Sequence, residues 1–219
     1  MLFNVVTSIN FDNKILFVEF KNTNKNNALS LKMLDELISI LSKKKLLHQY
    51  QAIVFKGYKN SSFSAGADLN DIKFLKKNKN LNSYHRKLNT VLNKLKEIKV
   101  IKISVIKNFC IGAGFIFAMY TDICIANRNC LFSIPASKLN ISLPKSQLDF
   151  LLKKFPKNQL LKETIFTGRK FSTSEAYNFN LINIVFSDKN FKRSYLEYLA
   201  ELTNSDFKVK KYYFNKLYS

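Results

Sequence analysis

The chain has few of the residues that build metal sites and disulfide frameworks. Its 219 residues include three cysteines, two histidines and no tryptophan. Cys110, Cys124 and Cys130 form no Cys-X-X-Cys pair. Both histidines, His48 and His85, lie far from the cysteines in the sequence. This spacing matches no zinc pattern and the odd count gives no complete disulfide framework, so we expect free or buried thiols and no metal site.

Long hydrophobic runs and linkers are also missing. The first twenty residues alternate as strands do, without a basic stretch followed by a continuous apolar run. This pattern predicts neither a signal peptide nor a membrane span, and indicates a cytoplasmic protein. Three prolines and five glycines leave no flexible linker. With 47% hydrophobic residues, the chain has the material for a single α/β domain with one sizeable core.

Acidic residues are scarce. Fifteen Asp and Glu oppose 36 Lys and Arg, which gives a net charge of +21. Such a charge attracts nucleic acid, an anionic membrane or a phosphate-rich small molecule, and does not choose between them. The lysines are spread along the whole chain, and no zinc-finger, basic-zipper or RNA-binding motif gathers them. We therefore interpret most of this charge as a solvated surface and expect no nucleic-acid partner.

Strand and helix patterns alternate along the chain. Residues 2–9 and 14–20 predict a hairpin, and residues 52–55, 101–106 and 123–126 predict short buried strands. This alternation indicates a layered α/β fold with partly parallel strands, followed by a helical second half. The expected helices begin after Ser30, Asp68 and Gly112 or occupy residues 81–97, 146–154, 157–165, 173–179, 188–202 and 205–217.

Two turns rich in glycine and alanine each lead into a predicted helix. One is Phe-Ser-Ala-Gly-Ala-Asp at residues 63–68, and the other is Gly-Ala-Gly-Phe at residues 112–115. Their small side chains let a ligand approach the backbone, and the N–H groups of Ala67 and Ala113 lie near helix starts, where free donors favour negative charge. Two such amides suit a thioester oxygen that gains charge as an enolate. Taken alone, each turn is more typical of simple helix packing.

Five blocks of residues follow one another along the chain. They are Asn-Ala-Leu-Ser at 27–30, residues 63–69, residues 111–123, Phe-Ser-Ile-Pro-Ala-Ser-Lys-Leu-Asn-Ile at 132–141, and residues 167–182. Together they resemble the crotonase (enoyl-CoA hydratase/isomerase) family over nearly the whole chain. The resemblance implies an α/β fold with a crotonase-like ββα spiral core at residues 1–186 and a C-terminal helical layer, formed by a truncated helical segment at residues 187–219.

The resemblance also implies a ligand and an assembly. Family members bind acyl-CoA thioesters, with the carbonyl oxygen between two backbone amides that match those of Ala67 and Ala113. Coenzyme A would be part of the substrate, and no cofactor would be tightly bound. The implied assembly is a homotrimer or a dimer of trimers. The residues expected to contact the CoA moiety are Lys25, Ala65, Asp68 and Leu69.

The sequence departs from the family at the two glutamates with which hydratases move protons. The matching positions hold Ile116 and Ala136, and no Asp or Glu occurs between Asp122 and Asp149. We therefore predict an enoyl-CoA hydratase/isomerase-family lyase or isomerase that stabilises a thioester enolate through its amides, not a two-glutamate hydratase. Decarboxylation of a malonyl-type thioester fits best, because loss of carbon dioxide forms the enolate without a base. A noncatalytic acyl-CoA-binding or assembly protein and an RNA-binding member are the alternatives.

Two asparagines replace family glycines. Asn108 and Asn140 stand where the family pattern often has glycine. Asparagine tolerates left-handed backbone better than other non-glycine residues. We therefore expect both turns to keep their left-handed conformation.

Overall fold

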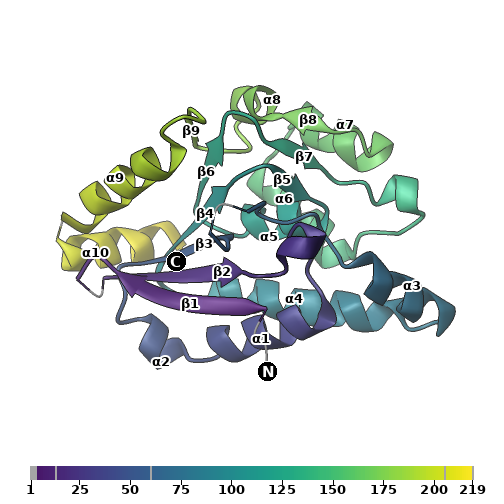
Figure 1. The fold of residues 1–219 in the computed structure, drawn as a ribbon, viewed down its shortest axis with the longest axis horizontal. Helices are drawn as coiled ribbons and strands as arrows, with labels where there is room; N and C mark the ends of the chain where they lie inside the picture. The colour runs from purple at the N-terminus through teal and green to yellow at the C-terminus, as the bar shows by residue number, and fades with distance from the viewer. Residues whose placement is uncertain (1–3, 13, 60, 205, 219) are drawn as a thin grey trace.

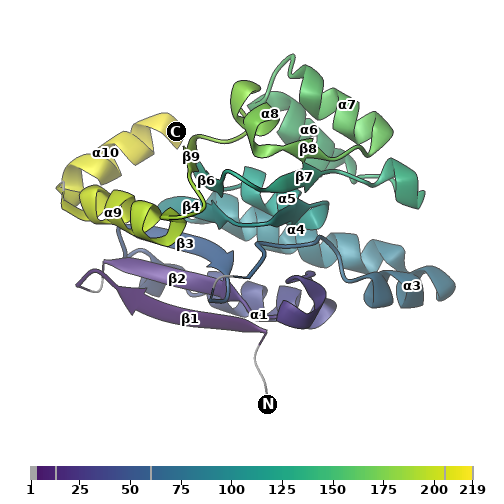
Figure 2. The ribbon, with the colours of Figure 1, turned by 45° about the horizontal axis from the view of Figure 1, so that its top comes forward.

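The computed structural model describes the whole chain except residues 1–3, 13, 60, 205 and 219. Residues 2, 3 and 13 of the expected hairpin and residue 205 of the last expected helix lie outside the described residues. Figures 1 and 2 show two sheets with helices packed around them.

A six-stranded sheet forms the centre of the fold, in the order β1-β2-β3-β4-β6-β9. The first two strands are antiparallel, as the hairpin pattern predicts, and every later pair is parallel. The three buried strands expected from the sequence are confirmed as β3, β4 and β6. The strands are β1 (Val5–Asn10), β2 (Ile15–Phe20), β3 (Ala52–Gly57), β4 (Ile101–Ile106), β6 (Ile123–Asn127) and β9 (Ile184–Phe186).

A second sheet has three short strands, which the sequence patterns did not predict. They are β5 (Phe109–Ile111), β7 (Leu131–Ser133) and β8 (Phe171–Ser172), in the order β5-β7-β8. Strands of two or three residues are too short to show an alternating pattern. The chain passes from β4 in the large sheet to β5 in the small sheet and then into a helix, and β6 leads to β7 in the same way. This repeat is the ββα spiral.

The helices lie close to their predicted positions. Ser30 and Asp68 cap the helices that follow them, since their side chains accept the N–H groups of Met33 and Asn70. No helix among the described residues is long and apolar enough to cross a membrane. The helices are α1 (Leu31–Leu41), α2 (Lys44–Leu47), α3 (Leu69–Lys77), α4 (Leu81–Glu97), α5 (Ala113–Met119), α6 (Lys145–Lys154), α7 (Gln159–Thr167), α8 (Thr173–Asn178), α9 (Phe191–Asn204) and α10 (Phe207–Tyr218), with 3-10 turns η1 (Thr23–Lys25) and η2 (Ser137–Leu139).

Helices cover both faces of the large sheet. On one face α1, α4 and α5 bury the main hydrophobic core, and on the other face α9 packs on a smaller apolar cluster. Phe191, Tyr195 and Leu199 of α9 are buried there against sheet residues such as Phe17 and Val54. Figure 1 shows α9 and α10 together at one end of the sheet, away from α3. The expected C-terminal helices are therefore present, while a domain boundary at residue 186 stays a prediction.

Candidate active site

The two glycine-rich turns lie against each other. The N–H of Ile111 donates to the carbonyl oxygen of Ser64 at 3.0 Å. Gly66 has φ +99° and Gly112 has φ +52°, a backbone region that favours glycine. A side-chain carbon added at Gly66 would lie 2.9 Å from the carbonyl oxygen of Ile111 and 3.7 Å from the amide nitrogen of Ala113. Glycine at residue 66 therefore permits the close approach of the two turns.

Side chains on neighbouring elements hold the first turn in place. The buried amide of Asn27 donates to the carbonyl oxygen of Ser62 at 2.5 Å. Asp71, in the first turn of α3, accepts the N–H of Leu31 at 2.7 Å and so ties α3 to the start of α1. Because both contacts join segments more than thirty residues apart in sequence, the turn is fixed by tertiary packing.

The N–H groups of Ala67 and Ala113 donate no hydrogen bond within the described part of the chain. A backbone donor without a partner is uncommon away from solvent. The surrounding amides are already used, since those of Ala65, Asp68 and Gly112 donate to the carbonyl oxygens of Asn26, Leu29 and Ser133.

One cavity opens onto both turns. It has an empty volume of about 660 Å³ with its open mouth included, and it is lined by the two turns, α3, α4, the start of α5, the segment 134–143 and α6. Most of its lining is apolar, with Tyr84, His85 and Gln147 as the polar side chains. No Asp or Glu is found among the described residues that line it. The cavity can therefore hold an apolar group beside two backbone donors.

The structure places four of the six expected site residues on this cavity. Ala65, Ala67, Leu69 and Ala113 line it. The other two, Lys25 and Asp68, are outside the lining and pair with each other, with the Lys25 Nζ 2.7 Å from the Asp68 Oδ2. Asp68 is buried, whereas the Lys25 side chain is 46% exposed. The part that each residue plays in binding a ligand stays a prediction.

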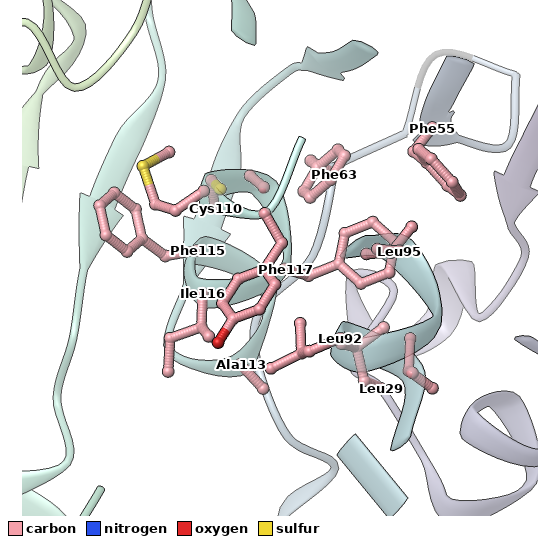
Figure 3. Close-up of a cluster of buried hydrophobic side chains, with 14 of the residues drawn as sticks. Leu29, Phe55, Phe63, Leu92, Leu95, Cys110, Ala113, Phe115, Ile116 and Phe117 are labelled. Atoms are coloured by element: carbon pink, nitrogen blue, oxygen red, sulfur yellow. The ribbon is translucent and has the colours of Figure 1, made fainter. Parts of the chain in front are cut away.

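Ile116 and Ala136 lie on the same cavity, although they are twenty residues apart in sequence. Ile116 is almost fully buried, and Figure 3 shows it with Ala113 in a cluster of apolar side chains. Ala136 directly precedes η2. The two positions that the resemblance matches to the family glutamates therefore face one shared space.

The expectation for the two asparagines is confirmed. Asn108 has φ +55° and Asn140 has φ +51°, both in the left-handed region. Asn108 directly precedes β5, and its carbonyl oxygen accepts the N–H of Leu131 in β7. Asparagine therefore serves these turns without glycine.

Sequence reasoning did not assign a site role to Tyr84, His85 or Gln147. The Tyr84 hydroxyl donates to the carbonyl oxygen of Leu29 at 2.9 Å, and burial raises its pKa. Gln147 donates from its Nε2 to Asn89 at 2.7 Å. The sequence contains one signal that could have indicated a site role for His85. This residue lies beside the apolar stripe of the predicted helix 81–97, in a chain with only two histidines.

The three thiols are free and buried, which confirms the expectation for the cysteines. Burial raises the pKa of Cys110, Cys124 and Cys130. Within the described ranges, no group of three or more His, Cys, Asp or Glu side chains could hold a metal ion. Protonated, enclosed thiols are poor nucleophiles and poor metal ligands.

Replacing Gly66 with alanine is expected to lower the free energy of unfolding by about 1–3 kcal/mol. The new methyl group would meet the carbonyl oxygen of Ile111 at 2.9 Å, in a left-handed backbone that alanine adopts with strain. Urea denaturation measures the change. The control Ala67→Gly alters the same turn by one methyl group and is expected to cost no more than about 1 kcal/mol. A Gly66→Ala chain as stable as the parent would contradict the close approach of the turns.

Solved structures share this fold at low sequence identity. One structure, titled enoyl-CoA hydratase/carnithine racemase and from Magnetospirillum magneticum, has a TM-score of 0.89 at 17% identity. The match covers 99% of this chain and 80% of that chain. An enoyl-CoA hydratase from Bacillus anthracis has a TM-score of 0.87 at 19% identity, with 98% and 82% covered. The fold class is therefore the expected crotonase-like α/β fold with C-terminal helices.

Sequence comparison gives the family. The model of the enoyl-CoA hydratase/isomerase family matches residues 10–216, and the chain belongs to this family. The protein named probable enoyl-CoA hydratase 2, mitochondrial, from Arabidopsis thaliana is 25% identical over 173 residues, which are 79% of this chain and 57% of that protein. Carnitinyl-CoA dehydratase of Salmonella typhi is 30% identical over 103 residues, 47% of this chain and 39% of that protein. The chain thus spans about half the length of these curated relatives.

Proposed function

We propose that the chain is an acyl-CoA enzyme that holds the thioester oxygen between the N–H groups of Ala67 and Ala113. The observation that carries this proposal is that two residues whose backbone N–H groups have no partner in the described chain line one cavity. Membership of the enoyl-CoA hydratase/isomerase family supports a CoA thioester as the substrate. Donors aimed at an oxygen that gains charge stabilise an enolate more than they stabilise the ground-state thioester.

Binding of the CoA moiety is proposed at the outer side of the first turn. Ala65 and Leu69 line the cavity there, and the 55% exposure of Leu69 leaves an apolar surface for the adenine ring. Lys25 lies beside them through its ion pair with Asp68, so its charge would be close to a phosphate bound at this side. Coenzyme A would enter as part of the substrate, with no cofactor held permanently.

For the reaction, we propose decarboxylation of a malonyl-type thioester. The bond from the α-carbon to the carboxylate breaks, its electron pair forms the enolate, and carbon dioxide leaves. This step needs no base to remove a proton, which suits a cavity whose described lining contains no carboxylate. Two-glutamate hydration would need acid/base groups at the positions of Ile116 and Ala136.

The second candidate function is that of a noncatalytic acyl-CoA-binding or assembly protein, which the same apolar lining of the cavity favours.

We also propose that copies of the chain associate, as a homotrimer or a dimer of trimers. Support comes from the last helix, α10, which exposes several large apolar and aromatic side chains. Exposed apolar patches of this kind are typical of contacts between proteins. Light scattering of the purified chain tests the proposal, since a monomer at working concentration would contradict it. The exposed apolar and aromatic side chains of α10 are Val209, Tyr212, Tyr213 and Leu217.

Calorimetric titration with CoA, acetyl-CoA, malonyl-CoA and crotonyl-CoA tests the proposed function, with mass spectrometry of each mixture afterwards. We expect binding of the thioesters, conversion of malonyl-CoA to acetyl-CoA, and no hydration of crotonyl-CoA. Binding without any conversion would favour the noncatalytic candidate. Hydration of crotonyl-CoA at the rate of a hydratase would refute the proposed reaction, and no binding of any thioester would refute the ligand.

A further inference from the structure

His85 lies in the wall between two hollows. It lines the cavity that holds the two amides, and it also lines a surface groove formed by α4 and the segment 140–144. Among the described residues that line both hollows, His85 is the titratable one. Tyr84 lines the cavity alone, whereas Leu81, Asn82, Arg86 and Asn89 line the groove alone. An ionisable ring that faces both the cavity and the exterior is placed to move protons between them.

The imidazole of His85 is unsatisfied. Its Nδ1 is buried without a hydrogen-bond partner, and neither ring nitrogen makes a hydrogen bond to another described residue. The ring of Tyr84 lies edge-on to it, with 6.3 Å between centroids. Buried polar atoms are nearly always paired, because leaving one unpaired costs free energy. Such an exception on a cavity wall indicates a group kept free for a ligand or a reaction.

The surroundings of His85 favour the neutral form of the ring. Burial lowers the pKa of His85, because the charged imidazolium loses solvation there. The other titratable or charged groups on the two hollows are Tyr84, whose hydroxyl donates to Leu29 and whose pKa burial raises, and Arg86. The described lining has no carboxylate that would stabilise an imidazolium. A neutral imidazole at physiological pH is a general base.

We propose that His85 is the proton-transfer group of this cavity, acting at the carbon next to the thioester carbonyl. The inference rests on the proposed function and deepens it. The ring nitrogen takes a proton from that carbon, and the electron pair of the C–H bond moves into the enolate, whose oxygen the two amides hold. The imidazolium then exchanges its proton with water from the groove and returns one to the carbon. After decarboxylation, the neutral ring takes a proton from water of the groove and passes it to the carbon that has lost carbon dioxide, and so returns to its neutral form.

Deuterium exchange at the α-carbon tests this role. The full chain is incubated with acetyl-CoA in D2O, and mass spectrometry follows deuterium incorporation. We expect exchange with the parent chain and a loss of about 100-fold or more in His85→Gln. Calorimetry is expected to give the same acetyl-CoA affinity for both chains. The matched control is His48→Gln, since His48 is exposed, lies outside the cavity lining and is expected to leave exchange unchanged.

Two further readouts separate proton transfer from a merely structural role. In the parent chain the exchange rate is expected to rise with pH and to level off above the pKa of His85, which lies below its ordinary value, because only the neutral ring accepts a proton. That inflection should vanish in His85→Gln. If His85→Ala folds, which circular dichroism shows, added imidazole should restore part of the exchange by entering the space left by the ring.

Failure of this inference and failure of the proposed function give different results. If the parent chain decarboxylates malonyl-CoA and His85→Gln does so equally fast with unchanged exchange, His85 is not the proton-transfer group and the proposed function stands. Binding of acetyl-CoA without exchange in the parent chain also overturns the inference and leaves the ligand in place. If the parent chain binds no thioester, the proposed function falls and the inference falls with it.

Discussion

Replacing Ala113 with proline is expected to lower the turnover of malonyl-CoA by about 100- to 1000-fold, the usual cost of one lost oxyanion donor. Proline removes the N–H that the proposed mechanism needs. Ala113 is the first residue of α5, a helix position that proline tolerates well. Gly112, with its flexible backbone, precedes it. The rate is measured as acetyl-CoA formed from malonyl-CoA, beside the thermal stability of the variant.

The control for this substitution is Gln159→Pro. Gln159 is likewise the first residue of its helix, α7, and it is exposed and absent from the cavity lining. Proline there tests the effect of the residue type on folding without touching the site, so turnover is expected to stay unchanged. An Ala113→Pro chain that is folded and as active as the parent would show that the Ala113 amide holds no charged oxygen.

Replacing Phe117 with alanine is expected to lower the free energy of unfolding by about 3–5 kcal/mol. Phe117 is fully buried in α5, with the rings of Phe20 and Phe55 edge-on at 5.4 and 5.0 Å between centroids. Figure 3 shows Phe117 close to Phe63 in the same cluster. Removal of the ring leaves a cavity that the rigid surroundings fill only in part. Urea denaturation monitored by circular dichroism measures the change.

Phe166→Ala is the matched control, because Phe166 is also on a helix, α7, and is 80% exposed. Its effect on stability is expected to stay within about 0.5 kcal/mol. Equal losses from the two substitutions would contradict the packing of α5 against the large sheet. Since Phe117 shares α5 with Ala113 and Ile116, the Phe117→Ala variant is also expected to loosen the second glycine-rich turn.

Elements with a strong local pattern were predictable from the sequence. The strand at residues 101–106 and the helix at residues 81–97 lie where the apolar spacing placed them. The short strands β5, β7 and β8 were not predictable, because each is held by one or two neighbouring strands and contains no repeat of its own. Helix α9 starts three residues later than the pattern indicated, at Phe191 and not at residue 188.

By itself, the sequence determined the backbone conformation of the two turns and the family. At residues 66 and 112 the backbone adopts conformations that few residues other than glycine adopt. These turns can therefore be recognised in the sequence from their glycines and the small residues beside them. Tertiary structure alone decided what surrounds them. His85 and Gln147 reach the cavity from α4 and α6, and Lys25 meets Asp68 across 43 residues of chain. Local sequence fixes conformation, whereas packing between distant segments fixes which side chains share a cavity.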